Sequence, residues 1–330
     1  MAAVTQRTVE ADEAGMRVDR WFKSHYPGLG FGALQKLLRS GQVRVDGGRV
    51  KTQTRLEAGQ TVRVPPIGEA ASAPRHMTAN TIRDRADGDV LAAMLLYEDP
   101  KVLVFNKPAG LAVQGGSGVT RSVDSMLEAW RDRKGVKPRL VHRLDRDTSG
   151  VMAVARTRGA AQALTKAFRE RTTRKLYWAL VHGVPSPRDA RISNWLHRDR
   201  TPDGDRMRVV KHGTPDADHA VSEYRVIDSG PRSVSWLELQ PHTGRTHQLR
   251  VHCQNMDHAI VGDDKYPDQH HREVPGGVQN KLHLHARRLI VPHPDTHKPP
   301  IDVTAALPPH MEQSWNLFGF DEADGAIDDD

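Results

Sequence analysis

The sequence predicts an α+β fold in which a mixed, largely antiparallel central sheet follows a small α+β unit. Strand-like and helix-like segments are interspersed without the regular βαβ rhythm of a parallel sheet. The chain has 330 residues, enough for one large and one small domain. Residues 66–88 are rich in Ala, Ser, Pro, Arg and Asp and lack apolar periodicity, as linkers do. We therefore expect a flexible N-terminus at 1–13, a small domain at 14–65, a linker, a large domain at 89–316 and an acidic tail at 317–330.

The charge distribution favours a partner with a phosphate backbone. The net charge is +7, but the last ten residues hold six acids and no base, which leaves +13 for the rest. The single cysteine, Cys253, excludes an intramolecular disulfide and a Cys-x-x-Cys zinc site. The first fifteen residues include Glu10, Asp12 and Glu13 and have no apolar core, unlike a signal peptide. No apolar run has the length of a membrane span, so we expect a soluble, cytoplasmic protein without a membrane partner. We also expect a monomer.

The small domain is expected to contain two helices, a hairpin and a strand. Apolar residues recur at helical spacing in 17–26 and again in 31–38. An Asp-Gly-Gly turn within 43–50 separates two short strand-like runs and predicts a tight hairpin. Residues 61–64 alternate as a strand. Ten Lys or Arg residues oppose three acids in residues 14–64, so the domain is basic.

This basic domain resembles an S4 RNA-binding domain. The resemblance rests on Arg17-Val18-Asp19, Leu37-Leu38-Arg39-Ser40-Gly41 and Val43-Arg44-Val45-Asp46-Gly47. It implies that the second helix and the adjoining loop dock on structured RNA, with Lys36, Arg39 and Arg44 as contacts. Phosphate-directed bases supply affinity and salt dependence but do not select a base sequence. The alternative is that these bases only keep a small domain soluble.

The large domain begins with a predicted hairpin and continues with mixed helices and strands. Apolar patterns predict strands at 95–97, 102–105, 151–155, 174–181, 222–226, 233–239, 282–286 and 289–291, and helices at 122–130 and 160–171. Residues 196–219 are polar and are expected to form a long surface excursion.

The stretch His142-Arg143-Leu144-Asp145-Arg146-Asp147-Thr148-Ser149-Gly150 has the densest charge and leads directly into the strand at 151–155. Carboxylates at the mouth of a core are well placed to hold substrates. From the residues alone, a solvated turn is the simplest interpretation. An Asp-x-Asp metal pair lacks further oxygen ligands, an aspartic protease would need Asp-Thr-Gly twice, and a glycosidase would need aromatic residues for sugar stacking.

Two other stretches lack the spacing of a ligand site. Residues 241–252 are expected to form a strand end, a Thr-Gly turn and a helix start. Their histidines, His242, His247 and His252, are five residues apart, unlike the i, i+4 pair of zinc hydrolases, so no metal site is expected. The glycine loop at 115–118 lacks the Gly-Lys-Ser/Thr ending of a nucleotide-binding P-loop.

The stretch 142–150 resembles the signature of the ribosomal large-subunit pseudouridine synthases, and matching motifs lie at 106–110, 175–177 and 244–250. The resemblance runs from Gly15 to Pro309. Pro267 stands where a glycine is usual, and 270–279 is a local elaboration. By this resemblance, Asp145 is the catalytic carboxylate, Tyr177 stacks on the uracil and Arg245 pairs with the carboxylate. Leu249 supplies apolar surface near the base, and Arg143 fills the space that the base vacates.

The implied function is isomerisation of uridines to pseudouridine in large-subunit (23S) ribosomal RNA, which is then the partner. Residues 114–118 resemble the branch that acts at several sites of this RNA. The reaction involves no net transfer of electrons, phosphate or water, so no cofactor is expected. Alternatives are another RNA substrate such as tRNA, a non-catalytic ribosome-binding or RNA-binding protein, and a metal-dependent nucleic-acid hydrolase.

Overall fold

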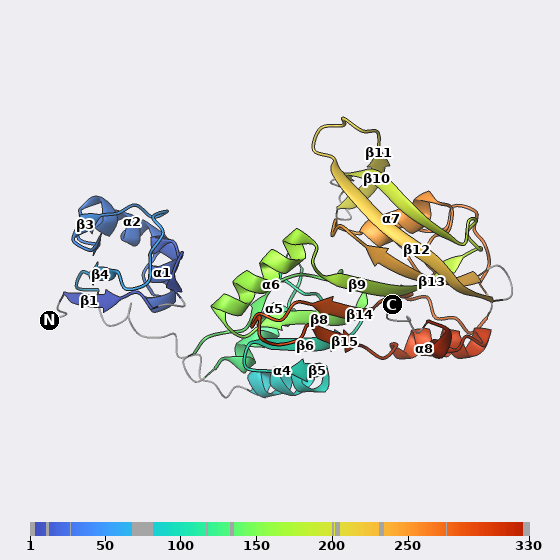
Figure 1. The fold of residues 1–330 in the computed structure, drawn as a ribbon, viewed down its shortest axis with the longest axis horizontal. Coiled ribbons are helices and arrows are strands. Elements are labelled where there is room, and N and C mark those ends of the chain that lie inside the picture. Colours follow the sequence, from blue (N-terminus) through green and yellow to red (C-terminus); the bar gives the residue numbers. More distant parts are fainter. Residues whose placement is uncertain are drawn as a thin grey trace. The chain divides into compact units, whose positions relative to one another are not determined.

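The computed structural model describes residues 4–10, 13–26, 28–67, 82–116, 118–132, 135–199, 201, 205–230, 234–274 and 276–325, with the side chains of 82–84 left out. Two compact units separate between Arg83 and Asp84. The ribbon in Figure 1 labels their helices and strands.

The N-terminal unit is a four-stranded antiparallel sheet with two helices. Its elements are β1 (Thr5–Thr8), α1 (Val18–His25), α2 (Phe31–Arg39), β2 (Arg44–Val45), β3 (Gly48–Arg49) and β4 (Thr61–Val64), with strand order β1-β4-β2-β3. Trp21, Phe22 and Leu34 are buried in its core, as helical spacing predicts. Asp46 and Gly47 both have positive φ, which matches the tight hairpin turn. The predicted helices, hairpin and strand are therefore confirmed.

The expectation of a flexible segment at 1–13 is wrong for the part that contains β1. Its four residues pair with β4 in antiparallel register, and the following Val9 is 1 % exposed. All four strand residues are exposed, so β1 depends on backbone pairing and has no apolar alternation that the sequence would reveal.

The C-terminal unit contains an eleven-stranded sheet. The strands along its main path run in the order β11-β10-β12-β13-β9-β14-β8-β6-β5, with β15 beside β14 and β7 beside β8. Their bounds are β5 Leu95–Glu98, β6 Val102–Lys107, β7 Arg139–Leu140, β8 Ser149–Ala155, β9 Arg174–His182, β10 Asp189–Asp199, β11 Arg206–Val210, β12 Asp218–Gly230, β13 Val234–Pro241, β14 Leu284–Val291 and β15 Ile301–Thr304. Only β14 and β8 pair in parallel among the described strands, which confirms the mixed, largely antiparallel prediction.

Helices cover both faces of this sheet. They are α4 (Ile82–Ala93), α5 (Val123–Met126), α6 (Arg158–Glu170), α7 (Gln248–Asn255) and α8 (Pro309–Phe318), with 3₁₀ turns η2 (Leu127–Trp130) and η3 (Glu322–Gly325). Alternate residues of β6 and β8 pack on α6 from one face and on α4 and α5 from the other. In the other half, α7 packs on β9, β12 and β13, and α8 packs on the Trp178 and Trp236 face. The loops before β8 and after β13 lie where the two halves of the sheet meet at β8, β9 and β14.

Three boundaries differ from the sequence expectations. The end of the expected linker 66–88 belongs to α4. This helix has only a weak amphipathic pattern, so apolar periodicity does not predict it. Residues 68–81 lie outside the described residues. The expected excursion at 196–219 contains the end of β10, all of β11 and the start of β12, exposed polar strands that pair through their backbones. The tail expected at 317–330 is packed as far as Gly325, because Phe320 is 7 % exposed in the tryptophan cluster and Glu322 pairs with Arg287 at 2.8 Å.

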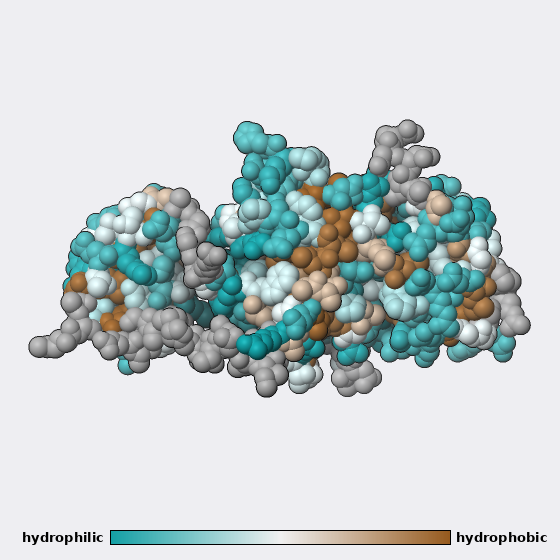
Figure 2. All heavy atoms as spheres, turned by 90° about the horizontal axis from the view of Figure 1, so that it is seen from below, coloured by the Kyte–Doolittle hydropathy of each residue, from teal (hydrophilic) through white to brown (hydrophobic). Residues whose placement is uncertain are grey.

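The exterior is largely hydrophilic on the face drawn in Figure 2, with apolar residues gathered near the middle of the C-terminal unit. Among the described residues, the large hydrophobic side chains that stay exposed are Val4, Phe31, Leu96, Val184 and Leu317. In this part of the chain, no helix has the length and apolar character needed to cross a membrane.

Candidate active site

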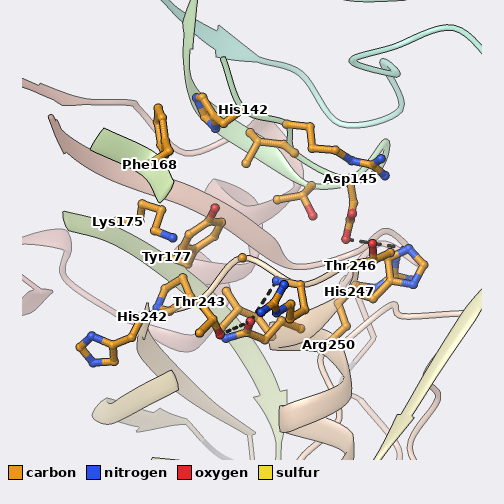
Figure 3. A pocket seen from close by; sticks show the side chains of 18 of the residues that line it. His142, Asp145, Phe168, Lys175, Tyr177, His242, Thr243, Thr246, His247 and Arg250 are labelled. Carbon is orange, nitrogen blue, oxygen red and sulfur yellow. Dashed lines mark hydrogen bonds and ion pairs between the residues drawn. The ribbon is translucent and has the colours of Figure 1, made fainter. Parts of the chain in front are cut away.

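A pocket of about 480 Å³ opens where four segments of the C-terminal unit converge. The loop before β8, the end of α6, the first half of β9 and the turn from β13 into α7 supply nearly all of its wall. In Figure 3, Tyr177 lies between Lys175 on one side and Asp145 with His247 on the other. The pocket therefore has an Asp145 end and a Lys175 end.

The structure separates the two carboxylates of the charged stretch. Asp145 lines the pocket, and its side chain is 18 % exposed. Asp147 is not among the lining residues; it pairs with Arg146 at 3.2 Å and its side chain is 41 % exposed. Asp145 is thus the carboxylate that can act on a molecule in the pocket.

A buried lysine fixes the loop that carries Asp145. Lys107 is fully buried, and its Nζ donates to the carbonyls of Pro108, Leu111 and Arg146, each at 2.9 Å. Burial lowers the pKa of this ammonium to about 7, and the charges of Asp147 and Asp145 oppose that shift. The motif at 106–110 does not reveal this role of Lys107 in the sequence, because one of its partners, Arg146, lies on the distant loop that carries Asp145.

The ends of the charged stretch anchor it to the sheet. His142 Nε2 accepts the Ala153 N–H at 2.9 Å, and burial lowers the pKa of this ring to about 3. Ser149 Oγ and His285 Nδ1 share a hydrogen bond of 2.9 Å. A Cβ on Gly150 would lie 2.2 Å from the Ala286 carbonyl oxygen, so only glycine permits this approach of β8 to β14.

Thr148 differs from these anchors. It lines the pocket and is 3 % exposed, and its hydroxyl has no hydrogen-bond partner among the described residues. A buried hydroxyl without a partner costs about 1–3 kcal/mol, which a ligand that pairs with it would recover. The sequence alone indicates no role for Thr148 in ligand binding.

The turn from β13 into α7 is held by a side-chain amide. Gln248 Oε1 accepts from the Thr243 hydroxyl at 2.6 Å and from the Arg245 N–H at 3.1 Å. Gln248 Nε2 donates to the Val221 carbonyl and the Ser222 hydroxyl. The strand end, Thr-Gly turn and helix start expected here are confirmed.

His247 faces Asp145 from the start of α7. Its Nε2 lies 4.0 Å from Asp145 Oδ2, and its Nδ1 lies 2.9 Å from the Tyr266 hydroxyl. That hydroxyl accepts the Met207 N–H at 2.8 Å, so its own proton can point to Nδ1 and a neutral ring then carries its proton on Nε2. Burial lowers the pKa of His247 even though Asp145 opposes the shift. Sequence reasoning gave His247 no role beyond the rejected metal site.

The expected pairing of Arg245 with Asp145 is wrong. Arg245 lines the pocket, but its Nη1 lies 3.3 Å from Asp218 Oδ1 and its Nε donates to the His219 carbonyl at 3.3 Å. The arginine that feels the charge of Asp145 is Arg250, on α7. Both arginines belong to one motif, and the turn before the helix directs the first one outwards to β12.

Arg250 is held by a buried carboxylate. Its Nε and Nη2 donate to the two oxygens of Asp263 at 2.7 and 2.6 Å, and both side chains are at most 5 % exposed. Burial alone would lower the arginine's pKa, but the hydrogen bond and charge of Asp263, with the charge of Asp145, raise it. The guanidinium is therefore a fixed positive group below the pocket.

The remaining expected residues fall on the pocket or on the N-terminal unit. Tyr177 and the 6 % exposed Leu249 line the pocket, and burial raises the pKa of the Tyr177 phenol, with Asp145 adding to the shift. Arg143 lines the rim. In the N-terminal unit, Lys36, Arg39 and Arg44 lie on or near α2, and the Arg44 guanidinium donates to the Gly41 and Gly47 carbonyls.

No group of three His, Cys, Asp or Glu side chains within the described ranges could hold a metal ion. The absence of a metal and of a cofactor stays a prediction.

Comparison with known proteins agrees with this geometry. The model of the family described as RNA pseudouridylate synthase matches residues 101–255, which include Asp145, Tyr177 and the turn into α7. The relatives below share more than 30 % identity over most of the chain, so the chain belongs to this family.

Among the similar proteins is "Ribosomal large subunit pseudouridine synthase C" of Pasteurella multocida (strain Pm70), 37 % identical over 94 % of this chain and 93 % of the relative. The protein of the same name from Escherichia coli (strain K12) is 38 % identical over 87 % of this chain and 88 % of its own length. The solved structure titled "Human RNA Pseudouridylate Synthase Domain Containing 4" has 30 % identity and a TM-score of 0.59, covering 72 % of this chain and 97 % of that one.

Proposed function

We propose that this protein isomerises specific uridines of large-subunit ribosomal RNA to pseudouridine, with Asp145 as the catalytic carboxylate. The observation that carries the proposal is the position of Asp145, in a nucleotide-sized pocket beside Tyr177, His247 and the buried Arg250. The relatives named as ribosomal large-subunit pseudouridine synthases support the substrate class.

The reaction exchanges one glycosidic bond for another within the same nucleotide. The N1–C1′ bond breaks, the uracil turns, and a C5–C1′ bond forms; C5 loses its proton and N1 gains one, so no cofactor is consumed. Two roles fit the carboxylate: attack on C1′, or removal of the 2′ proton to give a glycal. Both require ionised Asp145, whose charge contributes to the raised pKa of the neighbouring Arg250.

The pocket wall supplies binding groups for the displaced base. A target base must leave its stack at a cost of a few kcal/mol, and stacking on Tyr177 returns about 1–3 kcal/mol. Leu249 adds apolar surface. The unpaired Thr148 hydroxyl is available to a polar atom of the nucleotide. Arg143, at the rim, is the residue that fills the space left by the base.

Binding beyond the pocket is assigned to the N-terminal unit. Its basic surface, with Lys36, Arg39 and Arg44, contacts backbone phosphates of the structured RNA. We further propose that the enzyme works as a cytoplasmic monomer.

The experiment that tests the function is a comparison of pseudouridine maps of ribosomal RNA from a deletion strain and its parent. Specific large-subunit pseudouridines should disappear and return with wild-type protein, but not with Asp145→Asn. Loss of pseudouridine from tRNA instead would favour the alternative substrate. An intact map would favour a non-catalytic RNA-binding protein, and chelator-sensitive RNA cleavage by the purified protein would favour the hydrolase.

A further inference from the structure

The charges that line the pocket are unequally neutralised. Asp145 is the single acid among the lining residues, whereas six of them are Arg or Lys. Two of the six have carboxylate partners on neighbouring elements: Arg250 pairs with Asp263, and Arg245 with Asp218. The cations that remain lie away from these partners.

Three of the remaining cations come from one segment, the end of α6 and the start of β9. Arg171 and Lys175 have no carboxylate within 4.0 Å among the described residues, and Arg169 only reaches its neighbour Glu170 at that limit. Lys175 is half-buried, and burial lowers the pKa of its ammonium to about 8, with Arg171 adding to the shift. A half-buried ammonium beside another cation is costly unless an anion joins it.

Lys175 is also correctly placed for a substrate. Lys175 and Tyr177 are two residues apart on β9, so both side chains point to the same face of the sheet. Figure 3 shows them side by side at the wall of the pocket, with Phe168 above Lys175. A base that stacks on Tyr177 would bring the backbone of its own nucleotide, or of the next one, to Lys175.

We infer that the Lys175 end of the pocket is a phosphodiester subsite, in which Lys175 and Arg171, with Arg169 at the rim, bind a backbone phosphate next to the target uridine. The inference rests on the proposed function, because that function supplies the nucleotide. A second explanation exists for Arg171 alone, since it follows the C-terminus of α6, where the helix dipole favours cations. Lys175 lies on the next strand, so the dipole does not account for the pair.

The test compares Lys175→Gln and Arg171→Gln with the control Lys166→Gln, an exposed position on α6 that pairs with Glu170 and does not line the pocket. Affinity for a ribosomal RNA fragment should fall on the order of tenfold for each subsite variant. The slope of log affinity against log salt should fall by about one for each. The control should change neither quantity. Arg171 is exposed, so its variant keeps the test decisive if Lys175→Gln folds poorly.

A second arm identifies the phosphate. In a series of RNA fragments, each fragment carries one neutral methylphosphonate at a different position around the target uridine. Each is compared with a fragment that has the same sugar modification at that position but an ordinary phosphate. Wild-type protein should lose affinity at one position beside the target, and Lys175→Gln should lose nothing further there. Equal sensitivity at every position, or additive losses in the variant, would overturn the subsite. These assays measure binding, so they stay separate from the proposed function, which fails if wild-type protein forms no pseudouridine.

Discussion

The Asp145 end and the Lys175 end of the pocket differ in how their charges are neutralised. Around Asp145, the buried arginine and the histidine are fixed by partners: Arg250 by Asp263, and His247 by Tyr266. At the other end, Arg171 and Lys175 have no such partners among the described residues. The difference indicates that the protein builds the reacting end in advance and leaves the other end to be completed by the RNA.

The largest expected effect comes from the partner network at the Asp145 end. Arg250→Met leaves Asp263 buried and unpaired, so the free energy of unfolding should fall by about 3–5 kcal/mol. Arg245→Met breaks only half-exposed contacts and should cost at most about 1 kcal/mol. Urea unfolding of the two variants provides the comparison. Equal losses would contradict the distinction drawn between the two arginines.

Tyr177 lies between the two ends, and its ring is predicted to stack on the uracil. Tyr177→Phe keeps the ring, whereas Tyr177→Ala removes it, so the two should differ by about 1–3 kcal/mol in transition-state stabilisation. The measurement is kcat/KM on one RNA fragment, with circular dichroism to verify folding. A folded alanine variant as fast as wild type would reduce Tyr177 to a packing residue.

Acid should weaken the scaffold under the Asp145 end. Burial lowers the pKa of His252 to about 4 and of His285 to about 3, and these rings hold Ser222 and Ser149. Between pH 6.5 and about 4, the unfolded chain binds protons that the folded chain does not, so stability falls as the pH falls. Each ring contributes about 1.4 kcal/mol per pH unit in that window.

The variant His252→Gln tests this sign. The pH slope of its unfolding free energy, measured in urea from pH 7 to 4.5, should be smaller than the wild-type slope by the contribution of one histidine. His270→Gln, at an exposed position, is the control and should keep the wild-type slope. A steeper slope for His252→Gln would mean that the ring is charged in the folded protein.

The smallest effect is expected from the N-terminal unit, for which we propose phosphate contacts outside the pocket. Lys36→Gln combined with Arg39→Gln should reduce the salt slope of RNA binding by about two and leave the rate at saturating RNA unchanged. Lys166→Gln serves as the control in filter-binding titrations. An unchanged slope would leave these bases with a role in solubility alone.

The sequence was sufficient where a pattern is local. Helical spacing located α1 and α2, the apolar run located β8, and the resemblance of the charged stretch to a family signature pointed to Asp145. It failed where partners are distant in the chain. Arg245 and Arg250 belong to one motif and cannot be distinguished in the sequence. In the folded chain they differ, because Arg250 pairs with the buried Asp263 and Arg245 with Asp218. The three carbonyls bound by Lys107 likewise meet only in the folded chain.

Exposed strands were the second kind of failure. In β1 every residue is exposed, and much of β10 and β11 is exposed or half-buried, so polar residues hide the strand alternation. These strands form because backbone groups pair with a neighbouring strand, which no apolar count reveals.

The central claim is that Asp145, and not its neighbour in the sequence, performs the chemistry at the built end of the pocket. The most direct test measures pseudouridine formation by Asp145→Asn and Asp147→Asn on the same ribosomal RNA fragment, with binding measured in parallel. Asp145→Asn should bind the RNA but form no detectable product, because an amide can neither attack the ribose nor remove its proton. Asp147→Asn should retain measurable turnover. Normal turnover by Asp145→Asn would contradict the account, and an inactive Asp147→Asn beside it would show that the other carboxylate is the catalyst.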